Sequence, residues 1–297
     1  MDRTQALGLT LASLVLWTGG CAPKKKPIVV GSKNFTEQVV LGEIIAQHLQ
    51  NRLPQARIVR QLNLSGTLIT YQALTTGQIT LYPEYTGTIE SEILKEKSSD
   101  AAQAWERSRL EMRRLAQVEV MPPLGIDNFF AMVIRGEDAR KYKLETLSQA
   151  AQIKTGWRLG AGYEFEQRLD GMPALALYHL PMGVPPRSMD LGLLYRALDD
   201  GQVTMIAANA TDGPLAAHDW KILQDDRKVF GPYQACILVR MDAETREPGL
   251  RPALSELSGK LTNEIMRKLD AAVDVEHRQA REVAADFLRQ AGLGAAK

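Results

Sequence analysis

The chain has 297 residues, with 36 Lys and Arg against 35 Asp and Glu, which gives a formal net charge of +1 at pH 7. Such a balance predicts neither a basic surface for nucleic acid nor a charged face for an acidic polymer, so the expected partner is a small molecule. The length is sufficient for two domains of ordinary size, each with its own buried core.

The N-terminus carries the features of a secretory signal. The apolar run Ala6 to Gly20 follows Arg3 and is too short to span a bilayer comfortably, so residues 1–20 are interpreted as a signal peptide. Cys21 follows directly and resembles the acylated cysteine of a bacterial lipobox, although Thr18 stands where leucine is usual. The alternative is an ordinary cleaved signal peptide. We therefore expect an extracytoplasmic protein that Cys21 anchors to the bacterial membrane.

Residues 21–26 contain lysines and a proline, as expected for a short tether between a membrane anchor and a globular domain. The globular part is predicted to begin with strand Ile28 to Gly31 and an amphipathic helix that ends near Arg52. Asn34 and Glu37 have the spacing of a capping box at the start of this helix. Since free N–H groups there attract anions, the turn around Lys33 is a predicted binding place for a carboxylate or a phosphate.

The next segments complete a βαβαβ unit. They are a strand at 58–62, a helix at 67–76 and a strand at 79–82, and right-handed crossovers between them predict a doubly wound parallel sheet. The charged segment 89–117 has the spacing of a solvated helical face and is interpreted as structural.

Two stretches repeat each other. Residues 71–80 and 195–204 share the pattern Tyr-x-Ala-Leu-x-x-Gly-Gln-Ile/Val-Thr, in which a helix ends at a glycine and a strand begins. The glycine is expected in the left-handed conformation that closes many helices. Polar turns at 82–88 and 208–213 follow the two strands, at the carboxyl ends where open α/β sheets bind ligands. The repeat therefore predicts two similar lobes with a ligand cleft between them.

The second lobe is predicted to begin where a turn leads into the apolar strand at Phe130. A strand at 158–160, a helix at 191–199 and strands at 203–207 and 221–223 follow. The chain is expected to return through 230–233, and helices near 254–269 and 276–291 complete the first lobe. We thus predict lobe 1 at 27–130 plus 234–297 and lobe 2 at 131–233, with two crossovers between them.

Several ordered motifs resemble one family. The segments are Gly31-Ser-Lys-Asn-Phe-Thr-Glu-Gln38, Asn63-Leu-Ser-Gly-Thr67, Leu81-Tyr-Pro-Glu-Tyr-Thr-Gly-Thr88, Thr211-Asp-Gly213 and Pro232-Tyr233. Together they are similar to the OpuAC-like substrate-binding proteins of glycine betaine/choline/carnitine ABC transporters. The resemblance implies a two-lobed type II periplasmic-binding-protein fold that delivers a small zwitterion to a permease and an ATPase. It implies no catalysis and no cofactor, and we expect a monomer.

The resemblance also implies roles for single residues. Tyr85 and Tyr233 match tyrosines of an aromatic cage, which holds a quaternary ammonium group against the negative faces of its rings. Lys33, Thr88 and Arg168 match the side that grips the ligand's carboxylate. The role of Arg168 is inferred from residues 164–171, which resemble the family's Glu-Phe-x-x-Arg-x-Asp-Gly segment. Arg168 pairing with Asp170 or Glu164 is the structural alternative. Tyr163 and Phe165 precede it in a loop that is expected to face the cleft.

Two positions depart from the family pattern. Phe130 stands where tyrosine is frequent, and Asn209 stands where another tyrosine is expected. Phenylalanine keeps a π face, whereas asparagine supplies a directional donor and acceptor, which suits a ligand that retains N–H groups. A quaternary ammonium osmolyte and another zwitterion, amino-acid-like or ergothioneine-like, therefore both remain open.

Rival functions have less support from the sequence. The four histidines lack metal-ligand spacing, and neither a phosphate-binding loop nor a nucleophile elbow is present, so no metal site and no catalytic residue is predicted. A transferase on this fold would need Cys236 as a nucleophile, but Cys236 lies in an apolar run typical of a buried strand. The main rival is a ligand-sensing protein that uses the same fold to signal ligand occupancy to a partner.

Overall fold

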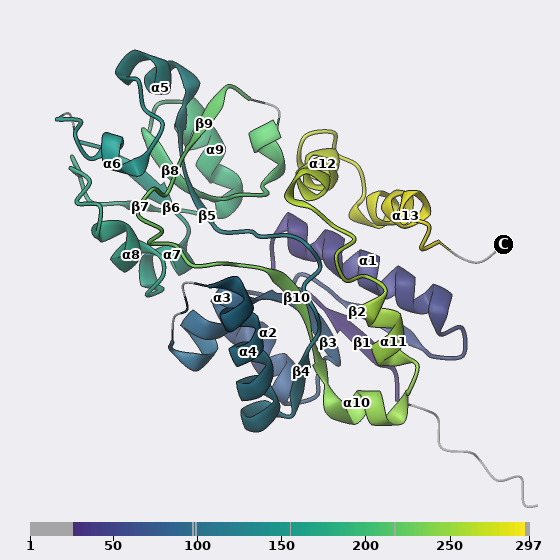
Figure 1. Ribbon diagram of the computed structural model, residues 1–297. Helices are drawn as coiled ribbons and strands as arrows, with labels where there is room; N and C mark the ends of the chain where they lie inside the picture. Colours follow the sequence, from purple (N-terminus) through teal and green to yellow (C-terminus); the bar gives the residue numbers. More distant parts are fainter. Residues whose placement is uncertain (1–25, 97, 99, 155, 217, 295–297) are drawn as a thin grey trace, which may run out of the picture.

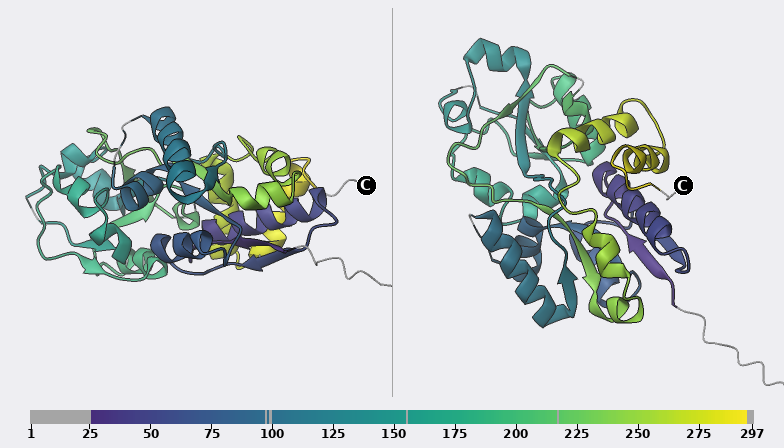
Figure 2. Two further views of the ribbon diagram at one scale, coloured as in Figure 1. Left: turned by 90° about the horizontal axis from the view of Figure 1, so that it is seen from below. Right: turned by 45° about the vertical axis from the view of Figure 1, so that its right-hand side comes forward.

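The computed structural model describes residues 26–294, apart from 97, 99, 155 and 217. The predicted signal peptide and Cys21 lie outside the described residues, as does all of the predicted tether except Lys26. Figure 1 shows two bodies of mixed helices and strands that two stretches of chain connect, and Figure 2 shows the same division from two other sides. Each body is built on one five-stranded sheet. We call them lobe 1 and lobe 2; the residue limits given above for the lobes stay a prediction.

The sheet of lobe 1 has the strand order β2-β1-β3-β10-β4. Its strands are β1 (Ile28–Gly31), β2 (Ile58–Gln61), β3 (Leu81–Tyr85), β4 (Val118–Val120) and β10 (Ala235–Arg240). Strand β1 pairs in parallel with β2 and β3, whereas β10 is antiparallel to both of its neighbours, β3 and β4. The sheet is therefore parallel except for the strand that returns from lobe 2.

The sheet of lobe 2 repeats this plan with the order β7-β6-β8-β5-β9. Its strands are β5 (Phe130–Arg135), β6 (Leu159–Ala161), β7 (Arg187–Ser188), β8 (Met205–Asn209) and β9 (Trp220–Leu223). Strand β6 pairs in parallel with β7 and β8, and β5 is antiparallel to β8 and β9. Again the antiparallel strand is the one that enters from the other lobe.

Helices cover both faces of each sheet. They are α1 (Thr36–Arg52), α2 (Thr67–Thr75), α3 (Thr86–Thr88), α4 (Ala101–Ala116), α5 (Gly136–Tyr142), α6 (Leu147–Ala150), α7 (Tyr163–Gln167), α8 (Met172–Ala176), α9 (Leu191–Asp199), α10 (Met241–Arg246), α11 (Leu250–Ser255), α12 (Asn263–Asp274) and α13 (Ala280–Gln290), with the π-helix η1 (Ile89–Leu94) and the 3₁₀-helix η2 (Gly213–Ala216). The described part of segment 89–117 thus splits into η1 and α4.

Alternate residues of one strand enter different cores, because successive side chains point to opposite faces of a sheet. In β10, Ile237 packs with α1 and the C-terminal helices, whereas Cys236 and Leu238 pack with α2 and α4. Two further cores cover the faces of the second sheet. Both sheets are thus doubly wound and mainly parallel, as predicted.

The repeat is a matched structural unit in the two lobes. Gly77 and Gly201 follow α2 and α9 with φ of +78° and +67°, the left-handed region that glycine adopts without steric cost. The threonine that ends each copy then bonds twice to a neighbouring strand. Thr80 exchanges both bonds with Val29, through its own N–H and its Oγ1, and Thr204 does the same with Arg158. This pair of hydrogen bonds explains why both copies end in threonine.

Three local predictions were wrong. Helix α1 has Phe35 as its N-cap and no side-chain cap, so Asn34 and Glu37 form no capping box. The strand predicted at 79–82 is β3, Leu81–Tyr85, because β10 pairs with it along its whole length. The helix predicted near 254–269 is divided into α11 and α12, and α10 precedes them. The helix predicted near 276–291 corresponds to α13.

The two crossing segments run side by side between the lobes. Asp127 and Gln234 form an isolated antiparallel bridge. The N–H of Asn128 donates to the carbonyl of Tyr233 at 3.0 Å, and the N–H of Tyr233 donates to Asp127 Oδ1 at 2.7 Å. The connection is therefore a short hydrogen-bonded ribbon.

Candidate functional site

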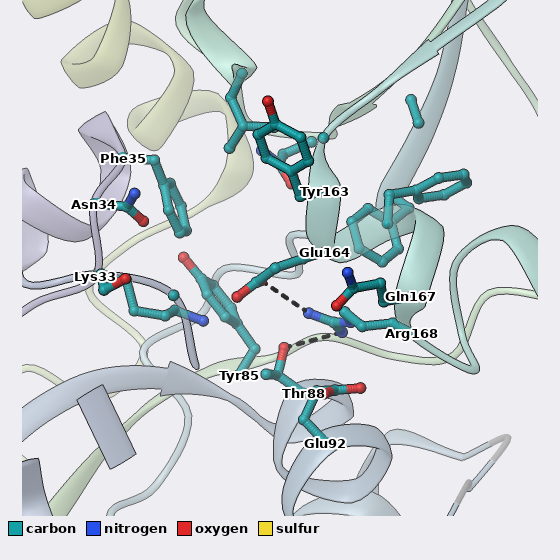
Figure 3. A pocket seen from close by; sticks show the side chains of 18 of the residues that line it. Lys33, Asn34, Phe35, Tyr85, Thr88, Glu92, Tyr163, Glu164, Gln167 and Arg168 are labelled. Atoms are coloured by element: carbon teal, nitrogen blue, oxygen red, sulfur yellow. Dashed lines mark hydrogen bonds and ion pairs between the residues drawn. The ribbon is translucent and has the colours of Figure 1, made fainter. Parts of the chain in front are cut away.

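A cavity of about 470 Å³ lies between the two lobes. Its wall contains all seven residues that the sequence predicts to touch a ligand, namely Lys33, Tyr85, Thr88, Phe130, Arg168, Asn209 and Tyr233. They come from six separate parts of the chain. Figure 3 shows the side chains of Lys33, Tyr85 and Thr88 opposite those of Tyr163, Glu164 and Arg168.

Lys33 follows β1 and carries a buried, paired ammonium group. Its Nζ donates to Glu84 Oε1 at 2.6 Å and lies 3.5 Å from Thr67 Oγ1. Glu84 is fully buried in β3 and also accepts from the Tyr82 hydroxyl and the Tyr85 N–H. The charge of Lys33 is therefore balanced by the protein, and its Nζ stands 4.8 Å from the centre of the Tyr85 ring.

Arg168 is the corresponding cation in lobe 2. Its Nε and one terminal nitrogen donate to the two oxygens of Asp170 at 2.9 and 2.7 Å, the bidentate geometry that suits guanidinium and carboxylate. The same terminal nitrogen lies 3.3 Å from Thr88 Oγ1, which connects the two lobes. The alternative role, pairing with Asp170, is thus present in the structure, although Arg168 also faces the cavity.

The ion pair outweighs the effect of burial at Asp170. Burial alone raises the pKa of this carboxyl, but the hydrogen bonds and charge of Arg168 hold the pKa below its ordinary value. The Tyr233 hydroxyl donates to the same carboxylate. Arg168, Asp170 and Tyr233 therefore form one hydrogen-bonded unit.

Aromatic rings stand on both sides of the cavity. Phe130 contacts Phe165 edge to face at 4.9 Å between ring centres, and Tyr233 lies 5.8 Å from Phe130. The Arg168 guanidinium is 4.9 Å from the centre of the Phe130 ring. On the lobe 1 side, Phe35 stacks on Tyr85 at 6.4 Å. Both groups of rings thus face a cation of the protein.

The Tyr85 hydroxyl belongs to a buried network at the junction of the lobes. It donates to Glu37 Oε1 at 2.6 Å, and the second Glu37 oxygen accepts from Thr211 Oγ1 at 2.5 Å. Asn128 Nδ2 also donates to Glu37, at 3.1 Å. Burial raises the pKa of Glu37 although these three donors lower it. The network joins α1, β3, the crossing segment and the loop after β8.

Asn209 ends β8 and lines the cavity. Its backbone N–H and its Nδ2 both donate to Asp212, at 3.1 Å each. Since only the amide nitrogen can donate to a carboxylate, this bond orients the side chain. The Asn209 amide thus keeps its carbonyl oxygen as an acceptor and the second N–H of Nδ2 as a donor.

The contacts of Gly87 explain why a glycine stands at this position of the family-like motif at 81–88. A Cβ at this position would lie 2.8 Å from the Tyr233 ring and 2.6 Å from the Pro232 carbonyl oxygen. The Tyr233 ring therefore packs directly on the backbone of α3 at Gly87, which lies between the site residues Tyr85 and Thr88.

Cys236 lies in the core of lobe 1 and not in the cavity wall. It is fully buried opposite Glu84 in the β3–β10 pair, and burial with the nearby Glu84 charge raises the pKa of its thiol well above the ordinary value. A thiol in this state is a poor nucleophile. Within residues 26–294, excepting the four omitted positions, there is no group of three or more His, Cys, Asp or Glu arranged to hold a metal ion.

Sequence reasoning missed three residues of the site. Phe35 lies between Lys33 and α1 and lines the cavity; its position after a buried strand was the available signal. Asn128 contacts Glu37 and Thr211 from the crossing segment. Glu164 was considered only as a partner of Arg168, but its carboxylate reaches α2 in the other lobe. The loop predicted to contain Tyr163 and Phe165 is instead helix α7, which begins at Tyr163.

Among the described helices, none combines the length and the apolar character needed to cross a bilayer.

Comparisons with known proteins agree with the geometry. The family model for the substrate-binding domain of ABC-type glycine betaine transport systems matches residues 26–290. The chain is 30% identical over 289 residues to an ergothioneine transport permease/ergothioneine binding protein of Helicobacter pylori, covering 97% of this chain and 52% of that one. It thus spans about half the length of this relative.

Two other similar proteins are matched over almost their whole length. A glycine-betaine-binding protein of Pseudomonas aeruginosa is 30% identical over 295 residues, with 95% of this chain and 93% of the relative covered. A solved structure of a glycine betaine/carnitine/choline ABC transporter protein has a TM-score of 0.77 at 25% identity, and covers 90% of this chain and 99% of that one. The predicted type II periplasmic-binding-protein fold is confirmed. The chain therefore belongs to the substrate-binding proteins of ABC-type glycine betaine transport systems, a family that binds small solutes outside the cytoplasm and works with a permease and an ATPase.

Proposed function

We propose that this protein captures a small osmolyte of the glycine betaine, choline and carnitine type in the interlobe cavity and delivers it to a permease. The observation that carries this proposal is the pair of cations on the cavity's rings. Lys33 Nζ lies 4.8 Å from the Tyr85 ring centre, and the Arg168 guanidinium lies 4.9 Å from that of Phe130. Rings that attract these cations offer the same negative faces to a quaternary ammonium group.

The two ends of the ligand have different partners in this proposal. Tyr85, Phe130 and Tyr233 form a partial cage around the ammonium group, which has no N–H to donate and is held by ring faces at about 0.5–2 kcal/mol each. Lys33, Thr88 and Arg168 hold the carboxylate, with donors that charge strengthens. Lys33 and Arg168 each keep a protein carboxylate partner, so the ligand adds a bond without paying for a bare buried charge.

A second candidate follows from Asn209. Asn209 lines the cavity, and its amide, held by the bond from Nδ2 to Asp212, has a carbonyl oxygen that can accept a hydrogen bond. An acceptor is matched by a ligand that carries an N–H, such as an amino-acid-like or ergothioneine-like zwitterion. The name of the Helicobacter pylori relative supports the same candidate.

Transport needs a change that reports ligand binding, and the crossing ribbon suits this role. Asp127 and Gln234 hold the two crossings together, so the lobes rotate about one ribbon and close on the ligand. In this proposal the closed form docks on the permease, and acylation of Cys21 keeps the protein at the membrane. Loss of labelling by a radioactive fatty acid in Cys21→Ser would support the anchor, and retained labelling would refute it.

Calorimetric titration tests the ligand class. The purified protein is titrated with glycine betaine, choline, carnitine, ergothioneine and a set of amino acids. Dissociation constants in the micromolar range or below for a quaternary ammonium osmolyte would support the first candidate. Heat from ergothioneine or an amino acid alone would support the second and exclude the first.

A further inference from the structure

The start of helix α2 is a ready seat for an anion. Gly66 is its N-cap and supplies no side-chain acceptor, so the first N–H groups of the helix point away from it without an intrahelical partner. The dipole of the helix adds partial positive charge at this end. Gly66 lines the interlobe cavity, and the seat therefore opens toward the ligand.

A protein carboxylate takes this seat from the opposite lobe. Glu164 Oε1, in α7 of lobe 2, accepts from the N–H of Thr67 at 3.0 Å. Its second oxygen lies 3.8 Å from a terminal nitrogen of Arg168. Figure 3 shows the carboxylate in the middle of the site, between Tyr85 and Arg168.

The approach of Glu164 depends on Gly66. A Cβ on Gly66 would stand 2.1 Å from Glu164 Oε1, so any other residue would force the carboxylate away. Thr67 also brings the seat close to Lys33, since its Oγ1 lies 3.5 Å from Lys33 Nζ. Glu164 thus pairs with Arg168, and Thr67 links it to Lys33. Arg168 and Lys33 both belong to the carboxylate-holding side of the proposed site.

We propose that Glu164 is a specificity-determining residue whose carboxylate occupies the place of the ligand's carboxylate. The inference rests on the function proposed above and deepens it. A zwitterion brings its own carboxylate and has to displace Glu164 from Thr67 and Arg168. A cation without a carboxylate leaves Glu164 in its seat, where the negative charge balances the ligand. Glu164 therefore favours cations over zwitterions.

Glycine betaine and choline separate these two cases. Both carry a trimethylammonium group, but only glycine betaine has a carboxylate. In Glu164→Gln the competing charge is gone, and we expect glycine betaine to bind about tenfold more tightly and choline about tenfold more weakly, as for one charge-assisted hydrogen bond. The ratio of the two dissociation constants should thus change by about a hundredfold. Because Glu164 is half exposed, the variant should fold normally.

Glu92→Gln is the matched control. Glu92 lines the same cavity, but its carboxylate pairs with Lys95 at 3.6 Å. A general effect of negative charge on the cleft would appear in both variants. A change confined to Glu164→Gln supports the seat, whereas equal changes in the two variants, or the same factor for both ligands, would overturn it.

A second measurement needs no ligand. If Glu164 occupies the seat, the chemical shift of the Thr67 amide follows the ionisation of the Glu164 carboxyl, and this titration disappears in Glu164→Gln. Silence of both ligands with all variants would refute the proposed ligand class. The Thr67 amide then tests the placement of Glu164 separately. If its chemical shift depends on pH in the same way in the parent and in Glu164→Gln, the inference is overturned.

Discussion

Phe130 and Asn209 are cross-strand partners in the antiparallel pair of β5 and β8. Both also line the interlobe cavity. The two residues that depart from the family pattern are therefore neighbours, since the Cβ atoms of directly opposed residues lie about 5 Å apart. A substitution at Asn209 should therefore change the surroundings of the Phe130 ring.

A tyrosine at position 209 should restore a ring beside Phe130. In Asn209→Tyr we expect tighter binding of glycine betaine, by roughly three- to tenfold, because one more ring face contacts the ammonium group. Titration calorimetry measures this, with Asn209→Leu as a control that has bulk but no π face. Equal affinities in the tyrosine variant and the parent would show that position 209 lies outside the ligand's contacts.

Tyr85 contributes a ring to the cavity and a hydroxyl to Glu37, and two variants separate these contributions. Tyr85→Ala should weaken the binding of glycine betaine by about tenfold or more, through loss of the ring. Tyr85→Phe keeps the ring and should bind almost normally.

The same variants differ in stability. Tyr85→Phe removes one donor from the buried Glu37 carboxylate and should cost about 1–3 kcal/mol of unfolding free energy, measured by denaturant titration. A phenylalanine variant that is as stable as the parent but does not bind would reverse the assignment, placing the ligand contact on the hydroxyl.

Arg168→Ala should destabilise the protein as well as weaken binding. It leaves the carboxylate of Asp170 buried with the Tyr233 hydroxyl but without its cation, a change that typically costs about 3–5 kcal/mol. The paired change Arg168→Ala with Asp170→Ala should recover much of this loss, as thermal unfolding would report. If the double variant is less stable than the single one, the ion pair is not the source of the stability.

A cluster of carboxyls between the lobes predicts how stability depends on pH. Asp270 in α12 is buried, one of its oxygens has no hydrogen-bond partner among the residues that the structure describes, and the charges of Glu37, Asp212 and Asp274 act on it. Burial, with the charges of these three neighbours, raises the pKa of Asp270 well above its ordinary value of 3.8. The folded state thus favours the protonated carboxyl, and this stabilisation is present below pH 3.8 and disappears as pH rises through the raised pKa.

Asp270→Asn removes the ionisation, so it should raise the unfolding free energy at pH 7 by about 1–3 kcal/mol and change it little at pH 3.5. Denaturant titrations at several pH values test this. Asp286→Asn is the control, because Arg278 and Arg289 already pair with Asp286 and hold its pKa below the ordinary value. A loss of stability at pH 7 in Asp270→Asn would contradict the prediction.

Local patterns predicted the two-lobed plan because its causes lie within a few residues of each other. Gly77 and Gly201 take the left-handed conformation that their helices require, and Thr80 and Thr204 bond to the adjacent strand in the same way. Six of the seven predicted ligand residues lie at, or within three residues of, an end of a strand, and Arg168 follows helix α7; the two sheets bring these ends to one cavity.

The charge partners inside the cavity could not be read in the same way. Lys33 and Glu84 are 51 positions apart, and their pairing depends on the adjacency of β1 and β3. Glu37 has the spacing of a cap, but burial of α1 against the crossing segment turned its carboxylate toward Tyr85 and Thr211. The contact of Glu164 with Thr67 depends on the distance between lobes, for which a linear pattern contains no signal.

The position of β10 sets an order for assembly of the chain. Among the described residues, β4 pairs only with β10, and β10 separates it from β3. Lobe 2 is one continuous stretch, whereas the sheet of lobe 1 stays divided until residues 235–240 are inserted. A chain emerging from its N-terminus can therefore complete the second lobe first, and the first lobe last.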